Sequence, residues 1–279
     1  MLAAIAGGLR SAHVVAFDGY VGSQRDVFLL DLSVGRRFNV SHSPGDEYAP
    51  AWNSIGSRLV YRETLNYRRE ALHALDMNTF ASAVAVVGIA REDGIVRAGW
   101  TDQKEPHAFN LGYGEMWVGS AGESISPIGY GFNPSLSPDG QWVLYYADSP
   151  GDLNADVFAY DPVSRRTVNI SQSQAHDWNP AWSPDGSQIA FISSRDGNAE
   201  LYVVPFACIE RRTCAQDIRR LTQTQESELN PTWSPNGQQI AFVRDQGDAT
   251  QLFIIDVQTG LTQQVTWDSI SKRAPAWMP

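Results

Sequence analysis

Short apolar runs alternate with polar turns along most of the chain, and this pattern predicts strands. In one stretch the run IAFIS, which begins at Ile189, is followed by the polar turn SRDGNA and then by ELYVV at 200–204. A further run of the same character, RRLTQ, occupies 219–223. These runs are rich in Val, Ile, Tyr and Phe and show the period-two patterning of half-buried strands. No segment shows helical periodicity over about 11 residues or more, so we expect a chain with very little helix.

The chain contains an internal repeat built around a Pro-Asp-Gly or Pro-Asn-Gly turn. The clearest copies are NPSLSPDGQWVLY at 133–145, NPAWSPDGSQIAF at 179–191, NPTWSPNGQQIAF at 230–242 and the more divergent APAWNSIGSRLVY at 49–61. A fifth copy, RAGWTDQKEPHAF at 97–109, has lost the turn, and a truncated sixth, APAWMP, occupies 274–279. Because Pro presets its own dihedral angle and Gly accepts positive φ, each intact turn predicts a hairpin.

The spacing of the repeat predicts the architecture. The marker position of the copies falls at Trp52, Trp100, Leu136, Trp182, Trp233 and Trp277, with a mean interval of 45 residues. This interval matches the ~40–45 residues of one four-stranded propeller blade. The first unit begins with a second strand at 13–17, and the C-terminal APAW supplies the first strand that this unit lacks.

We therefore expect an all-β, six-bladed β-propeller of four-stranded antiparallel blades in a single domain over 1–279. Its ring is expected to be closed by the C-terminal strand joining the N-terminal blade, which removes free sheet edges. The expected blades are 274–279 with 11–46, then 47–92, 93–128, 129–175, 176–226 and 227–271.

Composition narrows the range of partners. The 279 residues carry a formal net charge of −10, and nucleic-acid binding depends on Lys and Arg that neutralise phosphates, so nucleic acid is not expected as a partner. The longest apolar stretches, such as Ala83–Val87, are far shorter than the ~20 residues that cross a bilayer, and no membrane span is expected. The opening MLAAIAGGLR lacks the charged leader of a complete export signal.

The repeat AWSPDGxxIAF resembles that of TolB-type six-bladed β-propellers. The resemblance extends over about the whole chain and concerns only the propeller portion of that family's members. It implies a bacterial scaffold, periplasmic or otherwise exported, that holds partner proteins on one face. Fold alone underdetermines function, so this expectation is by analogy. The unit at 93–128 departs from the pattern because it is the shortest and has lost its turn.

One face of such a propeller is the expected binding surface, because the loops at the start of the inner strands and those joining second to third strands meet there. Two residues before the repeat Pro position stand Tyr48, Val96, Phe132, Trp178, Leu229 and Arg273. The aromatic members are candidate contacts for a partner, although packing between blades as core is the commoner fate of an aromatic residue beside a strand. One position earlier stand Glu47, Asp177, Glu228 and Lys272, which predicts a partly acidic rim that attracts basic partners, or ordinary solvated loop charges.

A second register recurs at the start of the third strands: Asp26, Glu70, Glu115, Asp156, Glu200 and Gln251. One acid per blade favours structure over catalysis, which needs its carboxylates gathered at one place. We expect each acid to accept hydrogen bonds from turn backbone or from an arginine such as Arg195, and so to hold its hairpin together.

The remaining polar motifs predict little chemistry. No catalytic residue, metal site or cofactor is expected: His42 and His176 lie in loops of the candidate face three blades apart, too far to share a metal ion. Asp152, Asn154 and Asp156 mimic the start of a calcium loop without its Gly and distal Glu, so at most weak calcium binding is expected there. Cys208 and Cys214 could form a small disulfide loop or remain two free thiols.

The functional expectation is a non-catalytic protein-binding scaffold whose candidate face is formed by Tyr48, Phe132, Trp178, Glu47, Asp177, Glu228, His176 and Arg273. The alternative is a carbohydrate-binding or metal-dependent carbohydrate-cleaving propeller, in which the same aromatic rings would stack on sugars. A small molecule or glycan is therefore kept as a ligand beside a protein partner.

Overall fold

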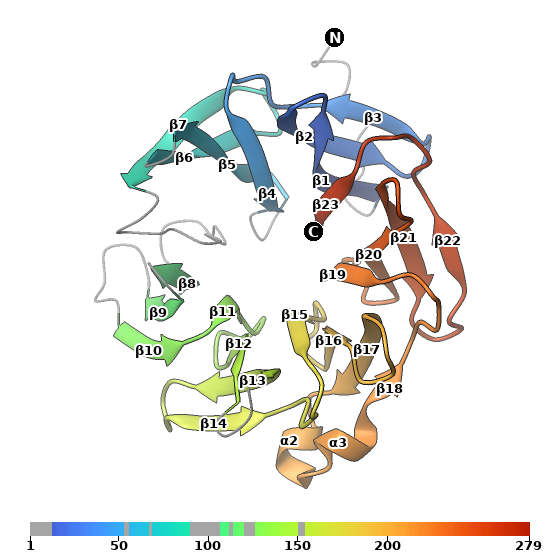
Figure 1. Cartoon of the computed structure of the whole chain (residues 1–279). Coiled ribbons are helices and arrows are strands. Elements are labelled where there is room, and N and C mark those ends of the chain that lie inside the picture. The colour runs from blue at the N-terminus through green and yellow to red at the C-terminus, as the bar shows by residue number, and fades with distance from the viewer. Residues whose placement is uncertain are drawn as a thin grey trace.

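The computed structural model describes residues 13–52, 56–66, 69–89, 107–111, 114–119, 126–149 and 154–279. Within these ranges the chain folds as small antiparallel sheets arranged around a common centre, which is a β-propeller (Figure 1). No helix in the described part of the chain is long and apolar enough to span a membrane. The predicted positions Val96, Trp100 and Asp152 lie outside the described residues.

Five sheets have four strands each, as the repeat predicts. The blade that carries the N-terminal strands consists of β23 (Lys272–Trp277), β1 (Val14–Val21), β2 (Gln24–Asp31) and β3 (Arg36–Asn39). The next consists of β4 (Asp46–Trp52), β5 (Arg58–Asn66), β6 (Arg69–Asp76) and β7 (Ser82–Ile89). A third consists of β11 (Phe132–Leu136), β12 (Val143–Asp148), β13 (Ala155–Asp161) and β14 (Arg166–Asn169).

The C-terminal half supplies the other two four-stranded blades. One consists of β15 (Asp177–Trp182), β16 (Gln188–Ser193), β17 (Glu200–Pro205) and β18 (Arg219–Arg220). The other consists of β19 (Glu228–Trp233), β20 (Gln239–Asp245), β21 (Thr250–Asp256) and β22 (Thr262–Gln264). Four-stranded antiparallel blades are therefore confirmed.

Within the described residues, five such blades are present rather than the six predicted. The unit at 93–128 is a three-stranded sheet in the part of the chain that the structure describes, with β8 (His107–Leu111), β9 (Glu115–Gly119) and β10 (Ser126–Tyr130). This is the unit whose repeat has lost its Pro-Asp-Gly turn, and residues 90–106, where its first strand was expected, lie outside the described ranges. A ring closed on all sides stays a prediction.

The two ends of the chain meet in one blade. β23 pairs antiparallel with β1, with Trp277 opposite Val15 and Lys272 opposite Gly19. The backbone N–H of Met278 also donates to the carbonyl of Val14 at 2.9 Å. The last strand of the chain is thus the inner strand of the blade that contains its first strands (Figure 1).

Each intact repeat turn is fixed by its own side chains. In the turn between β15 and β16, the Ser183 hydroxyl donates to Asp185 at 2.6 Å and accepts from the N–H of Gln188 at 2.9 Å. Gly186 supplies the positive φ of 71° that the turn requires. The same pattern recurs at Ser137 and Ser234, whose hydroxyls donate to Asp139 and Asn236 respectively.

The marker tryptophans join neighbouring blades. The indole N–H of Trp233 donates to the carbonyl of Ala181 at 3.2 Å, and that of Trp182 donates to Ser135 at 3.3 Å. In the same way Trp52 donates to Ala276 on β23 at 3.0 Å. Each large ring fills the space between two sheets while its one polar atom is satisfied by the preceding inner strand.

The insertion between β17 and β18 contains two single-turn helices, α2 (Cys208–Arg211) and α3 (Cys214–Asp217). Cys208 and Cys214 form a disulfide, which decides between the two alternatives left by the sequence. Both cysteines are buried in a cluster that includes Ile209, with Trp182 and Phe206 packed against it.

We expect removal of this disulfide to lower the free energy of unfolding. Closing a loop of this size restricts the unfolded chain by about 2 kcal/mol, so the double variant Cys208→Ala with Cys214→Ala should lose about that much in urea unfolding. A reducing agent should lower the unfolding midpoint of the parent chain and leave that of the variant unchanged. An equal response of both proteins to the reductant would contradict a stabilising disulfide.

Candidate binding face

The exposed apolar side chains are concentrated on the face where the inner strands begin. We call this the inner-strand face; it consists of the connections into each inner strand and the hairpins between second and third strands. Of nine exposed large hydrophobic side chains among the described residues, six lie on it: Tyr20, Val21, Leu65, Tyr130, Phe132 and Trp267. The other three, Val34, Val163 and Leu261, lie in turns between third and fourth strands on the opposite face.

The predicted aromatic contacts differ in how far they reach solvent. Phe132 is 48% exposed and its ring lies against Tyr146, with centroids 5.5 Å apart. Trp178 is half-buried against the core cluster between the β15–β18 and β19–β22 blades. Tyr48 is half-buried, and the guanidinium carbon of Arg25 lies 4.8 Å from its ring centroid. Among these three, Phe132 is the side chain most available to a partner.

The predicted acidic rim is wrong for the residues that suggested it. Glu47, Asp177 and Glu228 are 1%, 0% and 0% exposed, so they are neither rim charges nor solvated loop charges. Each lies at the start of an inner strand beneath the surface, where a charge must find a partner. Lys272, at the same position of β23, is also fully buried.

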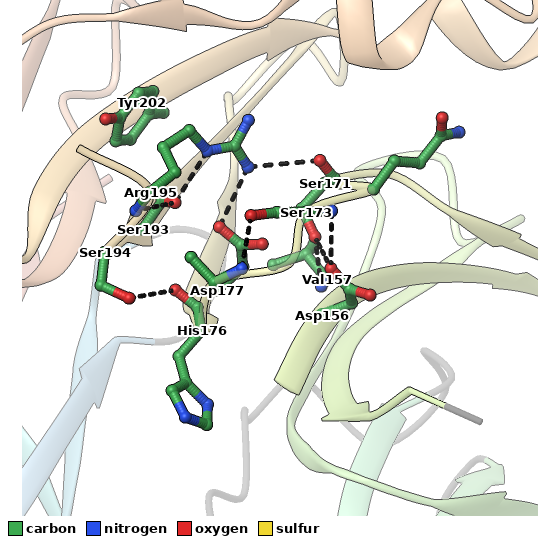
Figure 2. Close-up of polar contacts among 12 residues, drawn as sticks. Asp156, Val157, Ser171, Ser173, His176, Asp177, Ser193, Ser194, Arg195 and Tyr202 are labelled. Carbon is green, nitrogen blue, oxygen red and sulfur yellow. Dashed lines mark hydrogen bonds and ion pairs between the residues drawn. The ribbon is translucent and has the colours of Figure 1, made fainter. Parts of the chain in front are cut away.

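These buried groups belong to a polar unit that joins adjacent blades, shown for one junction in Figure 2. Asp156 on β13 accepts hydrogen bonds from Asn169 and Ser171 at 2.8 Å each, and from the hydroxyl of Ser149. Its Oδ1 also accepts from the N–H of Ser173 at 3.3 Å. Burial raises the pKa of Asp156, but these donors outweigh it and bring the pKa below its ordinary value.

The same junction continues to the next inner strand through an arginine. Arg195 donates to Asp177 at 3.0 Å and to the carbonyl of Ser171 at 3.2 Å (Figure 2). The third-strand acid therefore has the structural role that the sequence predicts, but Arg195 serves Asp177 on β15 and not the third-strand acids. Burial raises the pKa of Asp177, and Ser193 and Arg195 oppose that rise.

The unit recurs at three further junctions. Asp26 accepts from Asn39 at 2.7 Å, and Glu47 accepts from the N–H of Ser43 at 3.1 Å. Glu200 pairs with Arg220 and Glu228 pairs with Arg244, each at 2.8 Å. Gln251 accepts from Thr266 at 2.7 Å and lies beside Lys272. The side chains of Glu70 and Glu115 lie outside what the structure describes.

The junction between β17 and β19 places two carboxylates together. Burial raises the pKa of Glu228 to about 7, and its hydrogen bond and repulsion with Glu200 add to the rise. For Glu200, burial is outweighed by hydrogen bonds from Glu228, Thr222 and the backbone of Thr224, so its pKa is lowered. Glu228 therefore holds its proton to a higher pH than an ordinary glutamic acid does.

The raised pKa of Glu228 predicts how stability depends on pH. The folded-state pKa of Glu228, about 7, exceeds its ordinary value of 4.5, so between these values the folded protein holds a proton that the unfolded chain has released. The free energy of unfolding should fall as pH rises through this window, by about 2 kcal/mol. In Glu228→Gln, whose amide donates as the protonated acid does, urea unfolding should show a flatter dependence between these pH values. An unchanged slope would contradict the raised pKa of Glu228.

The junction that joins the two ends of the chain has a different charge pattern. Lys272 donates to Asp268, to the carbonyl of Ile270 and, at 3.4 Å, to Gln251. Burial lowers the pKa of Lys272, and its ion pair with Asp268 opposes that effect. Three other junctions place a third-strand acid near an inner-strand acid. This junction places the amide of Gln251 beside the ammonium group of Lys272.

The two remaining predicted residues reach the surface. His176 is exposed, and its Nδ1 accepts the N–H of Ala155 at 3.2 Å (Figure 2 shows the ring at the edge of the junction). Arg273 is exposed with its guanidinium carbon 5.9 Å from the ring centroid of Tyr20. Weak calcium binding near Asp152 stays a prediction. Of the two described residues of this motif, Asn154 donates to the carbonyls of Ser173 and Ala175, and Asp156 already accepts four hydrogen bonds.

The sequence analysis missed a cluster of arginines and tyrosines on the inner-strand face. In three blades, the residue of the second strand that pairs with the start of the inner strand is apolar or aromatic: Tyr146, Ile192 or Val243. In the two blades nearest the N-terminus it is Arg62, opposite Tyr48, and Asp18, opposite Arg273. That break in the apolar pattern is the signal that could have drawn attention to this sector.

The repeat, the four-stranded blades and the junctions agree with a match to known proteins. The profile of the TolB beta propeller domain family matches residues 132–279, slightly more than half of the chain. The chain therefore belongs to the TolB β-propeller domain family. The Tol-Pal system protein TolB of Hydrogenovibrio crunogenus is 34% identical over 64 residues, which cover 23% of this chain and 15% of that protein.

Two solved TolB structures share the fold. TolB from Acinetobacter baumannii has a TM-score of 0.77 at 17% identity, over 96% of this chain and 67% of that one. A TolB-like protein from Agrobacterium tumefaciens has a TM-score of 0.67 at 16% identity, over 90% of this chain and 88% of that one. At these identities the likeness to the TolB structures concerns the fold.

Proposed function

We propose that this TolB-family propeller is a non-catalytic protein-binding scaffold that presents its inner-strand face to a partner protein in the bacterial envelope. The observation that supports this most is the gathering of six of nine exposed large hydrophobic side chains on that face. Partner surfaces are anchored by such large side chains, which bury much area at little cost in rotamer freedom. The regular structure beneath them, with buried and hydrogen-bonded junctions, gives a rigid platform.

The location in the envelope has its own support. The Cys208–Cys214 disulfide is of the kind that persists in oxidising compartments and is rare in reducing ones. The relative with a matching sequence segment is a Tol-Pal system protein. Both observations favour an exported, periplasmic protein.

The experiment that tests the scaffold function is a pull-down from bacterial envelope extract with two matched triple variants. The first replaces Tyr130, Phe132 and Trp267 on the inner-strand face by Ala; the second replaces Val34, Val163 and Leu261 on the opposite face by Ala. All six side chains are exposed, so both variants should unfold within about 1 kcal/mol of the parent. A partner retained by the parent and by the second variant, but lost from the first, is the expected result.

Two outcomes would overturn the proposal. One is equal retention of every partner by both triple variants, which would place binding elsewhere. The other is release of unsaturated oligosaccharides from acidic glycans in the presence of a divalent metal. That release would favour the alternative, a carbohydrate-cleaving propeller in which the aromatic rings stack on sugars.

A further inference from the structure

Three guanidinium groups and two tyrosine rings form a continuous row on the inner-strand face. Arg62 and Arg25 lie on Tyr48, with guanidinium carbons 5.2 and 4.8 Å from its ring centroid. Arg25 and Arg273 both lie 5.9 Å from the ring centroid of Tyr20. The order Arg62, Tyr48, Arg25, Tyr20, Arg273 brings together β5, β4, the β1–β2 hairpin and β23, and we call it the arginine–tyrosine row.

The arginines of this row differ in the ion pairs that they make within the described residues. Asp18 is fully buried and pairs with Arg25 at 2.6 Å, while its other oxygen accepts the N–H of Ala49 at 2.9 Å. Arg273 is exposed and makes no ion pair within 4 Å among the residues that the structure describes. A guanidinium stays protonated in proteins even where burial lowers its pKa, as it does for Arg62.

The row therefore concentrates cations on a chain whose net charge is −10. An acidic side chain that binds beside these guanidinium groups gains charge-assisted hydrogen bonds. Tyr20, at 38% exposure, can add a phenolic donor. Val21 and Leu65, at 47% and 45% exposure, lie on the same face in the neighbouring hairpins and offer apolar contact.

We propose that the arginine–tyrosine row is a binding site for an acidic, extended peptide segment of the partner protein. This inference rests on the proposed scaffold function and names the chemistry of its partner. It reverses the electrostatic expectation from the sequence, because the acids that suggested a basic partner are buried in the junctions, while Arg273 is exposed and Arg25 and Arg62 are half-buried in the same row.

A short peptide fits the charges better than an extended polyanion or an anionic membrane. Charges more than about 8–10 Å apart are largely screened at physiological ionic strength, so a short segment responds mainly to the row itself. An anionic bilayer or a nucleic acid would lie against much more of the surface and meet the negative charge of the rest of the chain.

The test measures fluorescence anisotropy of a labelled oligoglutamate peptide, with oligoglutamine and oligolysine peptides of the same length beside it. The parent chain should bind oligoglutamate most tightly and lose affinity as salt rises. Arg273→Gln should weaken oligoglutamate binding about threefold, and the double variant with Arg62→Gln about tenfold or more. Arg165→Gln, an exposed arginine on the opposite face, is the matched control and should bind as the parent does.

Each outcome supports or overturns the assignment. Equal binding of oligoglutamate and oligoglutamine, or unchanged oligoglutamate affinity in Arg273→Gln, would overturn it; Arg273 is exposed, so that variant should fold normally. Stronger binding to phosphatidylglycerol vesicles than to oligoglutamate, with the same arginine dependence, would overturn the peptide as the ligand. A partner that the arginine variants retain but the Tyr130, Phe132 and Trp267 triple variant loses would leave the scaffold function standing and reject only this inference.

Discussion

Deletion of residues 274–279 should destabilise the whole chain by about 5 kcal/mol or more. The deletion removes most of β23, including Trp277, which is 6% exposed and packs between β1 and the neighbouring blade. It also removes the Ala276 carbonyl that accepts the indole N–H of Trp52. The loss should appear as a lower midpoint in urea unfolding, with aggregation by light scattering because the edge of β1 becomes unpaired.

A point substitution distinguishes the stability that comes from the backbone pairing of β23 from the stability that comes from the Trp277 side chain. Trp277→Ala keeps the β1–β23 pairing and should cost about 3–5 kcal/mol through lost packing alone. The truncated chain should be less stable than this variant and, unlike it, prone to association. A truncated chain with the unfolding midpoint of the parent would show that β23 does not hold the two ends of the molecule together.

Replacing Asp156 by Ala should cost about 3–5 kcal/mol, because one buried carboxylate accepts four hydrogen bonds at the junction between two blades. Its removal leaves the donors of Ser149, Asn169, Ser171 and Ser173 without their acceptor. Urea unfolding at neutral pH measures the loss.

Two substitutions serve as controls for this prediction. Asp156→Asn keeps the shape and part of the acceptor capacity and should be less destabilising than Asp156→Ala. Asp161→Ala, at the end of the same strand, removes hydrogen bonds from Val163 and Ser164 in the turn that follows and should have a much smaller effect. Equal effects of Asp156→Ala and Asp161→Ala would show that the junction is not a principal source of stability.

The fold could be predicted because its determinants are local. Each Ser-Pro-Asp-Gly turn carries its own hydrogen bonds, as Ser183 and Asp185 show, and the described Trp52, Trp182 and Trp233 occupy the same place between two blades. Where the repeat departs from the pattern, at 93–128, three strands lie within the described residues, and the stretch where the fourth was expected lies outside them. A four-stranded blade at this place stays a prediction.

The candidate site could be predicted only in part, because burial depends on neighbours that are distant in sequence. Glu47, Asp177 and Glu228 were placed correctly at the start of inner strands, but the sequence does not show that the preceding blade covers them. The arginine–tyrosine row is assembled from four separate strands and hairpins, so no single motif announces it. Phe132 alone among the predicted aromatic residues is an exposed large side chain.

The central claim is that one face of this propeller binds a protein partner, and site-specific photo-cross-linking tests it most directly. A photoreactive phenylalanine analogue is placed at Tyr130 or Trp267 on the inner-strand face, and at Val163 or Leu261 on the opposite face, in cells of an expressing bacterium. These four positions are between 69% and 94% exposed, so all report on accessible surface. The account predicts a discrete cross-linked protein from Tyr130 and Trp267 and none from Val163 and Leu261; the reverse pattern, or the same products from both faces, would contradict it.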